Sequence, residues 1–240
     1  MATAVPTARD LARETVRASI LAAARARLTD EGPAQLSLRA VARDVGMVSS
    51  AVYRYVASRD DLLTALLIAG YDELGAAVEE ADAAHPRDAH GARWVASCRA
   101  IRTWSIAHPG DFALLYGSPV PGYAAPQDTI EPAARVITVL VRAVVDAARA
   151  GAVPVPPRGT SATVGDVVAG ATGWVADRLD LPDADPELVV RTLMAWTTVF
   201  GTISFELFGH LVGSVDDTAA YFDQVIARLA GDLGFDVDVS

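Results

Sequence analysis

Apolar residues recur at intervals of three and four along most of the chain, and sustained two-residue alternation is absent from the sequence. Intervals of three and four place side chains on one face of an α-helix, whereas alternation would indicate a strand. The pattern therefore predicts an all-α protein. The predicted helices cover about 8–29, 38–44, 49–56, 58–83, 89–107, 111–116, 129–150, 164–179 and 186–211, with a last helix from 214 to near 231–234.

Glycine and proline separate a small N-terminal group of these helices from a larger remainder. Gly32 and Pro33 end the first predicted helix, and Gly46 ends the second, because glycine is favoured just beyond a helix and proline cannot continue one. The three helices before residue 58 predict an N-terminal domain of residues 1–57. The helices that follow predict a larger helical domain of residues 58–240.

The first three predicted helices match a helix-turn-helix arrangement, in which two short helices meet at a glycine and pack on a longer first helix. In such a unit the second short helix lies in the DNA major groove with its N-terminal residues at the base edges. Val41, Val45, Val52 and Val56 are better suited to the core of this unit than to contact with DNA.

Hydroxyl, phenol and guanidinium groups supply the chemistry for DNA contacts. Ser49 and Ser50 begin the predicted 49–56 helix with hydroxyls that can reach base edges, and Arg54 can bind phosphate or guanine. Free N–H groups at the start of the 38–44 helix favour a phosphate near Ser37 and Arg39. Taken singly, Tyr53 or Tyr55 would more often be a half-buried packing residue than a DNA contact. The predicted DNA-contacting residues are Ser37, Arg39, Ser49, Ser50, Tyr53, Arg54, Tyr55 and Arg59.

The charge of the chain is divided in the same way. The net charge is −10, yet residues 1–60 carry nine arginines against six acidic residues, and residues 61–240 carry eleven arginines against twenty-four. A basic N-terminal segment on an acidic remainder suits a polyanionic partner at the N-terminal segment. So small an excess of arginine also arises by chance.

The segment from Leu36 to Leu63 resembles the DNA-binding signature of the TetR family of transcriptional regulators. The resemblance is carried by the Ser37 and Arg39 opening, the Val45-Gly46 break, Ser49, the Val52-Tyr53 pair and the Arg59-Asp60-Asp61-Leu62 run, and Ile20 to Ala24 fits the family's first helix. The sequence departs from the family at three positions, where His, Phe and Lys are frequent and Tyr55, Val56 and Arg59 stand here.

The resemblance implies a homodimer whose paired recognition helices, about 34 Å apart, read a palindromic double-stranded operator. We expect the dimer interface on the last two long helices, where small residues allow close approach and phenylalanines supply apolar area. An ordinary place in the core of one chain is the alternative for the phenylalanines. The predicted interface residues are Thr197, Phe200, Gly201, Ser204, Phe205 and Phe208.

The middle of the chain resembles the WHG-type C-terminal subclass of this family, on the basis of Trp104, His108-Pro109, Phe112 and Gly117. The resemblance implies a pocket for a small-molecule effector, whose walls we predict to include Trp104, Phe112, Tyr116 and Trp174. Aromatic core residues are the alternative interpretation of each. With few charges nearby, the effector is expected to be apolar or aromatic, and its binding is expected to shift the 58–83 helix and release DNA, as in a repressor.

Other classes of protein receive little support from the sequence. The sequence lacks nucleotide-binding and hydrolase motifs, and His85 and His90 lack a zinc-type pattern, so we expect no catalytic residues, metal or cofactor. The single cysteine, Cys98, excludes a disulfide framework. No signal peptide is evident and no uncharged apolar run reaches the roughly 18 residues of a membrane span, so a cytoplasmic protein is expected. Two alternatives stay open: control by a protein partner, and a helical enzyme that uses Asp111, His108 and Asp177.

Overall fold

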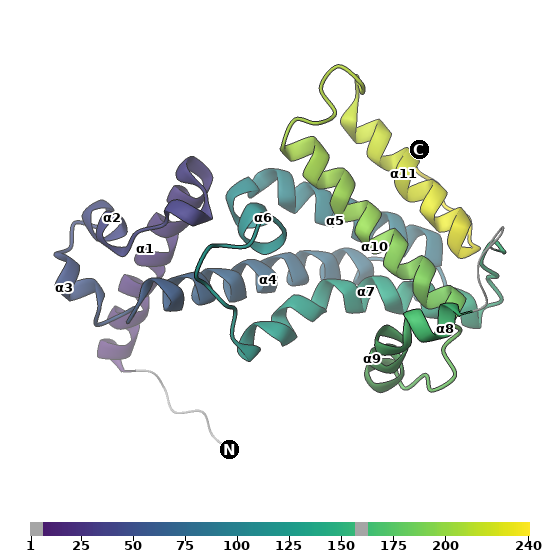
Figure 1. Ribbon diagram of the computed structural model, residues 1–240, viewed down its shortest axis with the longest axis horizontal. Coiled ribbons are helices and arrows are strands. Elements are labelled where there is room, and N and C mark those ends of the chain that lie inside the picture. The colour runs from purple at the N-terminus through teal and green to yellow at the C-terminus, as the bar shows by residue number, and fades with distance from the viewer. Residues whose placement is uncertain (1–6, 157–162) are drawn as a thin grey trace. The chain divides into compact units, whose positions relative to one another are not determined.

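The computed structural model describes residues 7–156 and 163–240, and every regular element in these ranges is a helix (Figure 1). The prediction of an all-α fold is therefore confirmed. The helices are α1 (Ala8–Glu31), η1 (Pro33–Gln35), α2 (Leu38–Asp44), α3 (Ser49–Val52), α4 (Arg59–Ala83), α5 (His90–Ala107), α6 (Pro109–Tyr116), η2 (Gln127–Thr129), α7 (Ile130–Arg149), α8 (Val164–Val167), α9 (Ala169–Leu179), α10 (Pro186–Leu207) and α11 (Thr218–Leu233).

Several helix ends differ from the predicted ends for identifiable reasons. α3 stops at Val52 because the next residues tighten into three-residue turns, with the Tyr55 N–H donating to the Val52 carbonyl at 2.9 Å. α10 stops at Leu207, just before Gly209 adopts a positive φ of 76°. α6 begins earlier than predicted, at Pro109, since proline suits the first position of a helix.

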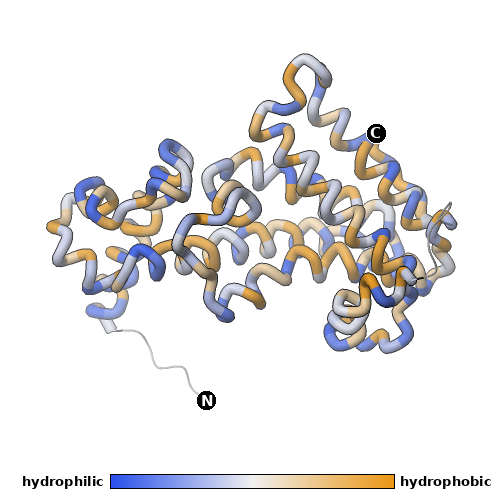
Figure 2. The backbone as a smooth tube through the Cα atoms, in the orientation of Figure 1, coloured by the Kyte–Doolittle hydropathy of each residue, from blue (hydrophilic) through white to orange (hydrophobic). Residues whose placement is uncertain are grey.

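Contacts divide the chain into two compact units. The first contains residues 1–73 and 107–133, and the second contains residues 74–106 and 134–240. The first unit thus joins the predicted DNA-binding segment to α6 and to the first part of α4. Figure 2 shows the apolar stretches of the helices alternating with polar ones along the chain.

In the first unit, α1 packs against α2 and α6, and α2 packs against α3. Ile20, Leu28, Val41, Val52 and Leu62 have almost no exposed surface and form its core. The valines at 41 and 52 are therefore core residues, as their spacing predicted. Their burial turns the polar side chains of α2 and α3 outward.

In the second unit, the core is crossed by specific polar links. The Trp94 indole N–H donates to the Ile226 carbonyl at 2.9 Å, which fastens α5 to α11. Arg93, only 5 % exposed, pairs with Asp82 at 2.8 Å and with Asp146 at 2.9 Å. These paired charges keep the ends of α4, α5 and α7 in one arrangement.

α10 alone among the described helices is long and apolar enough to cross a membrane by length and composition, with 39 % of the relevant window buried. Core helices pass the same test, and α10 packs against α8, α9 and α11 within the second unit. Its apolar character is therefore explained in part by packing inside the protein.

Candidate DNA-binding site and ligand cavity

α2 and α3 form the predicted helix-turn-helix. Gly46 adopts a positive φ of 66°, a conformation that glycine reaches without strain. The Gly46 N–H donates to the Arg43 carbonyl at 3.1 Å and the Met47 N–H donates to the Ala42 carbonyl at 2.8 Å. These bonds close the end of α2 and turn the chain sharply into α3.

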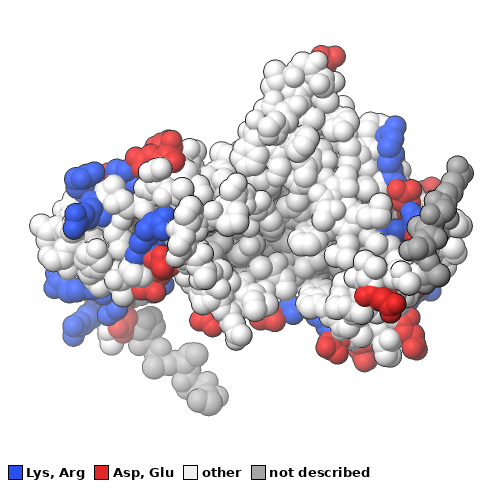
Figure 3. Space-filling view, in the orientation of Figure 1, with Lys and Arg blue, Asp and Glu red and all other residues white. Residues whose placement is uncertain are grey.

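α3 exposes most of its predicted contact residues. The Tyr53 side chain is 49 % exposed, and Ser50 and Arg54 are exposed, whereas Ser49 and Tyr55 are half-buried. Arg39, which is exposed on α2, and Arg54 form no salt bridge within the described residues. Arginines cover part of the visible surface of the first unit in Figure 3.

Two further features of this surface bear on DNA contacts. Ser37 occupies the N-cap position of α2, but its hydroxyl makes no capping hydrogen bond, so the hydroxyl is not committed to its own helix. Val48, directly before α3, is 70 % exposed. Sequence analysis passed over Val48, since an apolar residue in a turn carries no polar signal, although an apolar side chain there can contact a thymine methyl group.

Arg59 is occupied differently from the other predicted contact residues. Its Nε donates to the Leu36 carbonyl at 2.9 Å, and its Nη2 donates to the Ala34 carbonyl at 3.1 Å and to the Pro33 carbonyl at 3.3 Å. The guanidinium thereby fastens the start of α4 to the loop that precedes α2. A phosphate would have to use the donors that remain, since a guanidinium carries five.

The first unit also contains a buried ion pair. Arg25 of α1 pairs with Asp111 of α6 at 3.0 Å and with Glu73 of α4 at 2.7 Å. Asp111 is 3 % exposed. Burial raises the pKa of the Asp111 carboxyl, and the nearby Arg25 and His108 oppose that rise without cancelling it. Arg25 therefore joins three helices through one buried carboxylate, that of Asp111, and one exposed carboxylate, that of Glu73.

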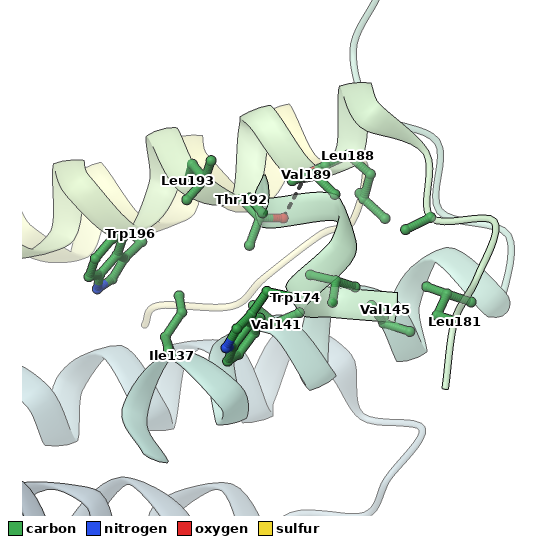
Figure 4. Close-up of a pocket in the computed structure, with 13 residues that line it drawn as sticks. Ile137, Val141, Val145, Trp174, Leu181, Leu188, Val189, Thr192, Leu193 and Trp196 are labelled. Atoms are coloured by element: carbon green, nitrogen blue, oxygen red, sulfur yellow. Dashed lines mark hydrogen bonds between the residues drawn. The ribbon is translucent and has the colours of Figure 1, made fainter. Parts of the chain in front are cut away.

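The second unit contains an apolar cavity of about 220 Å³. Side chains from α7, α9 and α10 surround it, and Trp174 and Trp196 stand at its sides (Figure 4). The Thr192 hydroxyl in its wall donates to the Leu188 carbonyl at 2.7 Å. The cavity therefore suits an apolar molecule. Its lining residues are Ile137, Val141, Val145, Ala171, Trp174, Val175, Leu181, Ala184, Leu188, Val189, Thr192, Leu193 and Trp196.

Of the four predicted pocket residues, Trp174 lines this cavity and the other three lie elsewhere. Trp104 is buried in α5. Phe112 and Tyr116 belong to the first unit, where their rings lie 5.4 Å apart and Tyr116 meets Tyr71 edge-on at 5.9 Å. These aromatic rings fill the core. The residues that sequence analysis missed form apolar stripes on α7 and α10, such as Ile137, Val141 and Val145 at intervals of four.

The predicted interface residues divide between the surface and the core of the second unit. Phe205 and Phe208 are 54 % and 51 % exposed, and Thr197 is exposed. Phe200 is only 8 % exposed and packs edge-on against Trp196. Gly201 and Ser204 are half-buried. Met194, which was not predicted, extends the exposed apolar surface of α10 and is 56 % exposed.

Metal and thiol chemistry find no site in the part of the chain that the structure describes. No group of three or more His, Cys, Asp or Glu residues there could hold a metal ion. Cys98 is fully buried, and burial raises the pKa of its thiol far above the ordinary value. A thiolate nucleophile is therefore disfavoured at this position.

Comparison with known proteins agrees with this architecture. Residues 20–66 match the model of bacterial regulatory proteins of the tetR family, and residues 94–229 match the tetracyclin repressor-like C-terminal domain. The chain is 40 % identical over 213 residues to the HTH-type transcriptional regulators Rv1816 of Mycobacterium tuberculosis (strain ATCC 25618 / H37Rv) and Mb1846 of Mycobacterium bovis (strain ATCC BAA-935 / AF2122/97), covering 88 % of this chain and 89 % of each relative.

Solved structures show the same fold. The putative regulatory protein SCO4313 has a TM-score of 0.76 and 31 % identity, covering 95 % of this chain and all of that one. A protein with unknown function from Rhodococcus sp. RHA1 has a TM-score of 0.63 and 27 % identity, covering 90 % of this chain and 95 % of that one.

The helix-turn-helix and the larger helical unit define a DNA-binding transcriptional regulator. The chain belongs to the TetR family, and the resemblance found in the sequence is confirmed.

Proposed function

We propose that this regulator is a cytoplasmic repressor that binds a palindromic operator as a homodimer and is released by a small apolar or aromatic effector. The observation that carries the proposal is the apolar cavity bounded by Trp174 and Trp196. Pockets that bind small molecules are typically concave, mostly apolar and lined by aromatic side chains, as this one is.

The exposed edge of α3 supports the DNA contacts. Ser49 and Ser50 begin the helix, where side chains reach base edges, and the exposed residues Tyr53 and Arg54 follow directly after its end. Ser37 and Arg39 at the start of α2, and Tyr55 after α3, are proposed to bind phosphate. Arg59 is proposed to act chiefly by holding the loop before α2, because three of its hydrogen bonds go there.

The exposed apolar surface of α10 supports a homodimer. Met194 and Phe205 on α10 and Phe208 directly after it are each more than half exposed, and exposed apolar patches are frequent at interfaces. A single DNA-binding domain makes few phosphate contacts, and such contacts weaken steeply at cellular salt. Two DNA-binding domains bound to one palindrome would restore the affinity for DNA.

The cavity indicates the class of effector. About 220 Å³ of apolar space beside two indole rings suits a compact ring compound that can stack on them. An effector that prefers the non-binding dimer by about 3 kcal/mol would weaken DNA binding roughly 150-fold.

The decisive experiment first selects the operator from a random duplex library and then measures operator affinity with and without a bound effector. Candidate effectors come from a thermal-shift screen of neutral one- and two-ring compounds. We expect a palindrome, a two-fold complex and weaker binding with effector. Tyr53→Ala should weaken DNA binding while the second unit stays folded.

Unchanged affinity at saturating effector would overturn the induction model. Release only by a co-purifying protein would favour control by a partner. The enzyme alternative has the least support, because Asp111 is committed to Arg25.

A further inference from the structure

The first two turns of α1 are helical, although their side chains are not buried against the rest of the unit. Residues 8–15 are all exposed, and the first fully buried side chain of α1 is Ile20. The helix start is closed by a capping box: the Asp10 N–H donates to the Thr7 hydroxyl at 3.2 Å, and the Thr7 N–H donates to the Asp10 carboxylate at 3.0 Å. Most helices owe their stability to a packed face, so this capped but unpacked segment has a surface free for a partner.

The charge on this segment is arranged in a stripe. Arg9, Arg13 and Arg17 are four residues apart, which places them along one side of a helix. All three are exposed, and none forms a salt bridge with a described residue. Further along the same helix, Arg25 and Arg27 are both paired with carboxylates. The unpaired cations of α1 are thus concentrated on the segment that nothing covers.

A hydrogen bond places this stripe beside the end of α3. The Arg13 guanidinium donates to the Arg54 carbonyl at 3.4 Å, and Arg54 follows α3 by two residues. Arg17 lines a shallow groove together with Tyr55. When the start of a recognition helix enters the major groove, its far end lies toward the groove wall, where the phosphates are. The stripe therefore lies on the phosphate side of the DNA-binding surface.

We propose that Arg9, Arg13 and Arg17 bind phosphates of the operator backbone beside the bases that α3 reads. Charge complementarity selects DNA as the occupant, because three guanidinium groups without a salt-bridge partner among the described residues share one side of α1, and Arg13 and Arg17 lie next to residues that follow α3. The three arginines precede residues 20–66, the segment that matches the family's DNA-binding model. They would enlarge the contact surface of this chain beyond that segment. The inference rests on the proposed role of α3 as the recognition helix.

The test compares the full-length protein with the variant R9Q/R13Q/R17Q on the selected operator, in one duplex that ends at the palindrome and in another that is extended by one turn on each side. Glutamine keeps the helix propensity and removes the charge. For each lost phosphate contact, the slope of log K against log salt falls by about 0.9. Three contacts on each of the two DNA-binding domains of the proposed homodimer would lower the slope by about 5.4, so the fourfold salt increase from about 50 to 200 mM would cost the wild type on the order of 2,000-fold more affinity than the variant.

Two control variants separate the loss of phosphate contacts from a general loss of positive charge and from a change in side-chain shape. R142Q/R149Q/R228Q removes the same charge from exposed positions of the second unit and should keep the wild-type slope. R9K/R13K/R17K keeps the charge and should keep most of the slope, which would show that the charge, and not the shape of the arginine side chain, causes the effect. The preference for operator over scrambled duplex should be the same in all variants, because phosphate contacts carry no direct sequence information.

The inference is overturned if R9Q/R13Q/R17Q binds both duplexes with the wild-type slope while Tyr53→Ala loses affinity. If Tyr53→Ala and Ser49→Ala also bind normally, the role of α3 fails, and the inference fails with it. A slope that falls equally in R142Q/R149Q/R228Q would show a general charge effect and would also overturn the proposal.

Discussion

Arg25 and Asp111 are joined at 3.0 Å inside the first unit, which fastens α6 directly to the first helix of the DNA-binding segment. α6 is therefore a structural part of the DNA-binding unit. Any displacement of α6 would strain this pair and the contact of Arg25 with Glu73 on α4.

Asp111→Asn is expected to lower the free energy of unfolding by only about 1 kcal/mol, because Arg25 is partly exposed and keeps its contact with Glu73, and because burial already disfavours the charged Asp111 carboxylate. Urea unfolding followed by circular dichroism measures this loss. Glu80→Gln, an exposed position of α4, is the control and should stay within about 0.5 kcal/mol of wild type. Equal stability of the two variants would show that the pair contributes nothing.

Gly110→Ala is expected to destabilise the protein, because a Cβ at Gly110 would lie 2.5 Å from the Thr29 backbone nitrogen. That backbone atom cannot swing aside as a flexible side chain could, so α6 must move away from α1. The matched substitution is Gly173→Ala in α9, where a Cβ meets nothing within 4 Å. Alanine there should stabilise by about 0.5–1 kcal/mol. Thermal unfolding should move in opposite directions for the two variants.

The carboxyl of Glu206 predicts how the stability of the protein changes at low pH. Burial alone would raise the pKa of its carboxyl, but hydrogen bonds from Arg102, one of them 2.8 Å long, hold the pKa below its ordinary 4.5. A carboxyl with a lowered folded pKa stabilises the protein above the unfolded pKa and loses that contribution as the pH falls through the folded value. Glu206→Gln should therefore show a smaller loss of stability below pH 4.5 than the wild type. If the free energy of unfolding fell in parallel with pH for Glu206→Gln and the wild type, this role of the Glu206–Arg102 pair would be contradicted.

Ala171→Leu tests the cavity by filling it. Ala171 lines the cavity, so three added carbons should occupy space meant for the effector and abolish the quenching of tryptophan fluorescence by a bound ring compound. Operator affinity in the absence of effector should be unchanged. Ala169→Leu, at an exposed position of the same helix, should leave effector binding intact. Wild-type effector affinity in Ala171→Leu would show that the effector binds elsewhere.

Phe205→Glu together with Phe208→Glu should give a monomer in light scattering, because two charges would replace the exposed apolar surface of α10. Operator affinity should fall at least about 100-fold, since linked binding by two DNA-binding domains is lost. Val167→Glu changes another highly exposed apolar residue and should leave the oligomeric state unaltered. A dimer that survives the phenylalanine changes would place the interface on another surface.

The sequence alone determined the local features of this protein. Gly46 ends α2 because of its own backbone freedom, and the spacing of Val41 and Val52 turns polar residues outward. These effects act over a few residues, so the all-α fold and the helix-turn-helix could be predicted, and the family resemblance followed from the same segment.

Only the tertiary structure decided which distant side chains meet. Arg59 was predicted to contact DNA, and only the structure shows that three of its hydrogen bonds go to the segment before α2. Phe112 and Tyr116 were predicted to line an effector pocket, and the structure places them in the first unit, whereas α7, α9 and α10 build the apolar cavity of the second unit. An aromatic or charged residue carries the same local signal in a core, a cavity or an ion pair. Packing across long stretches of chain determines which of these it joins.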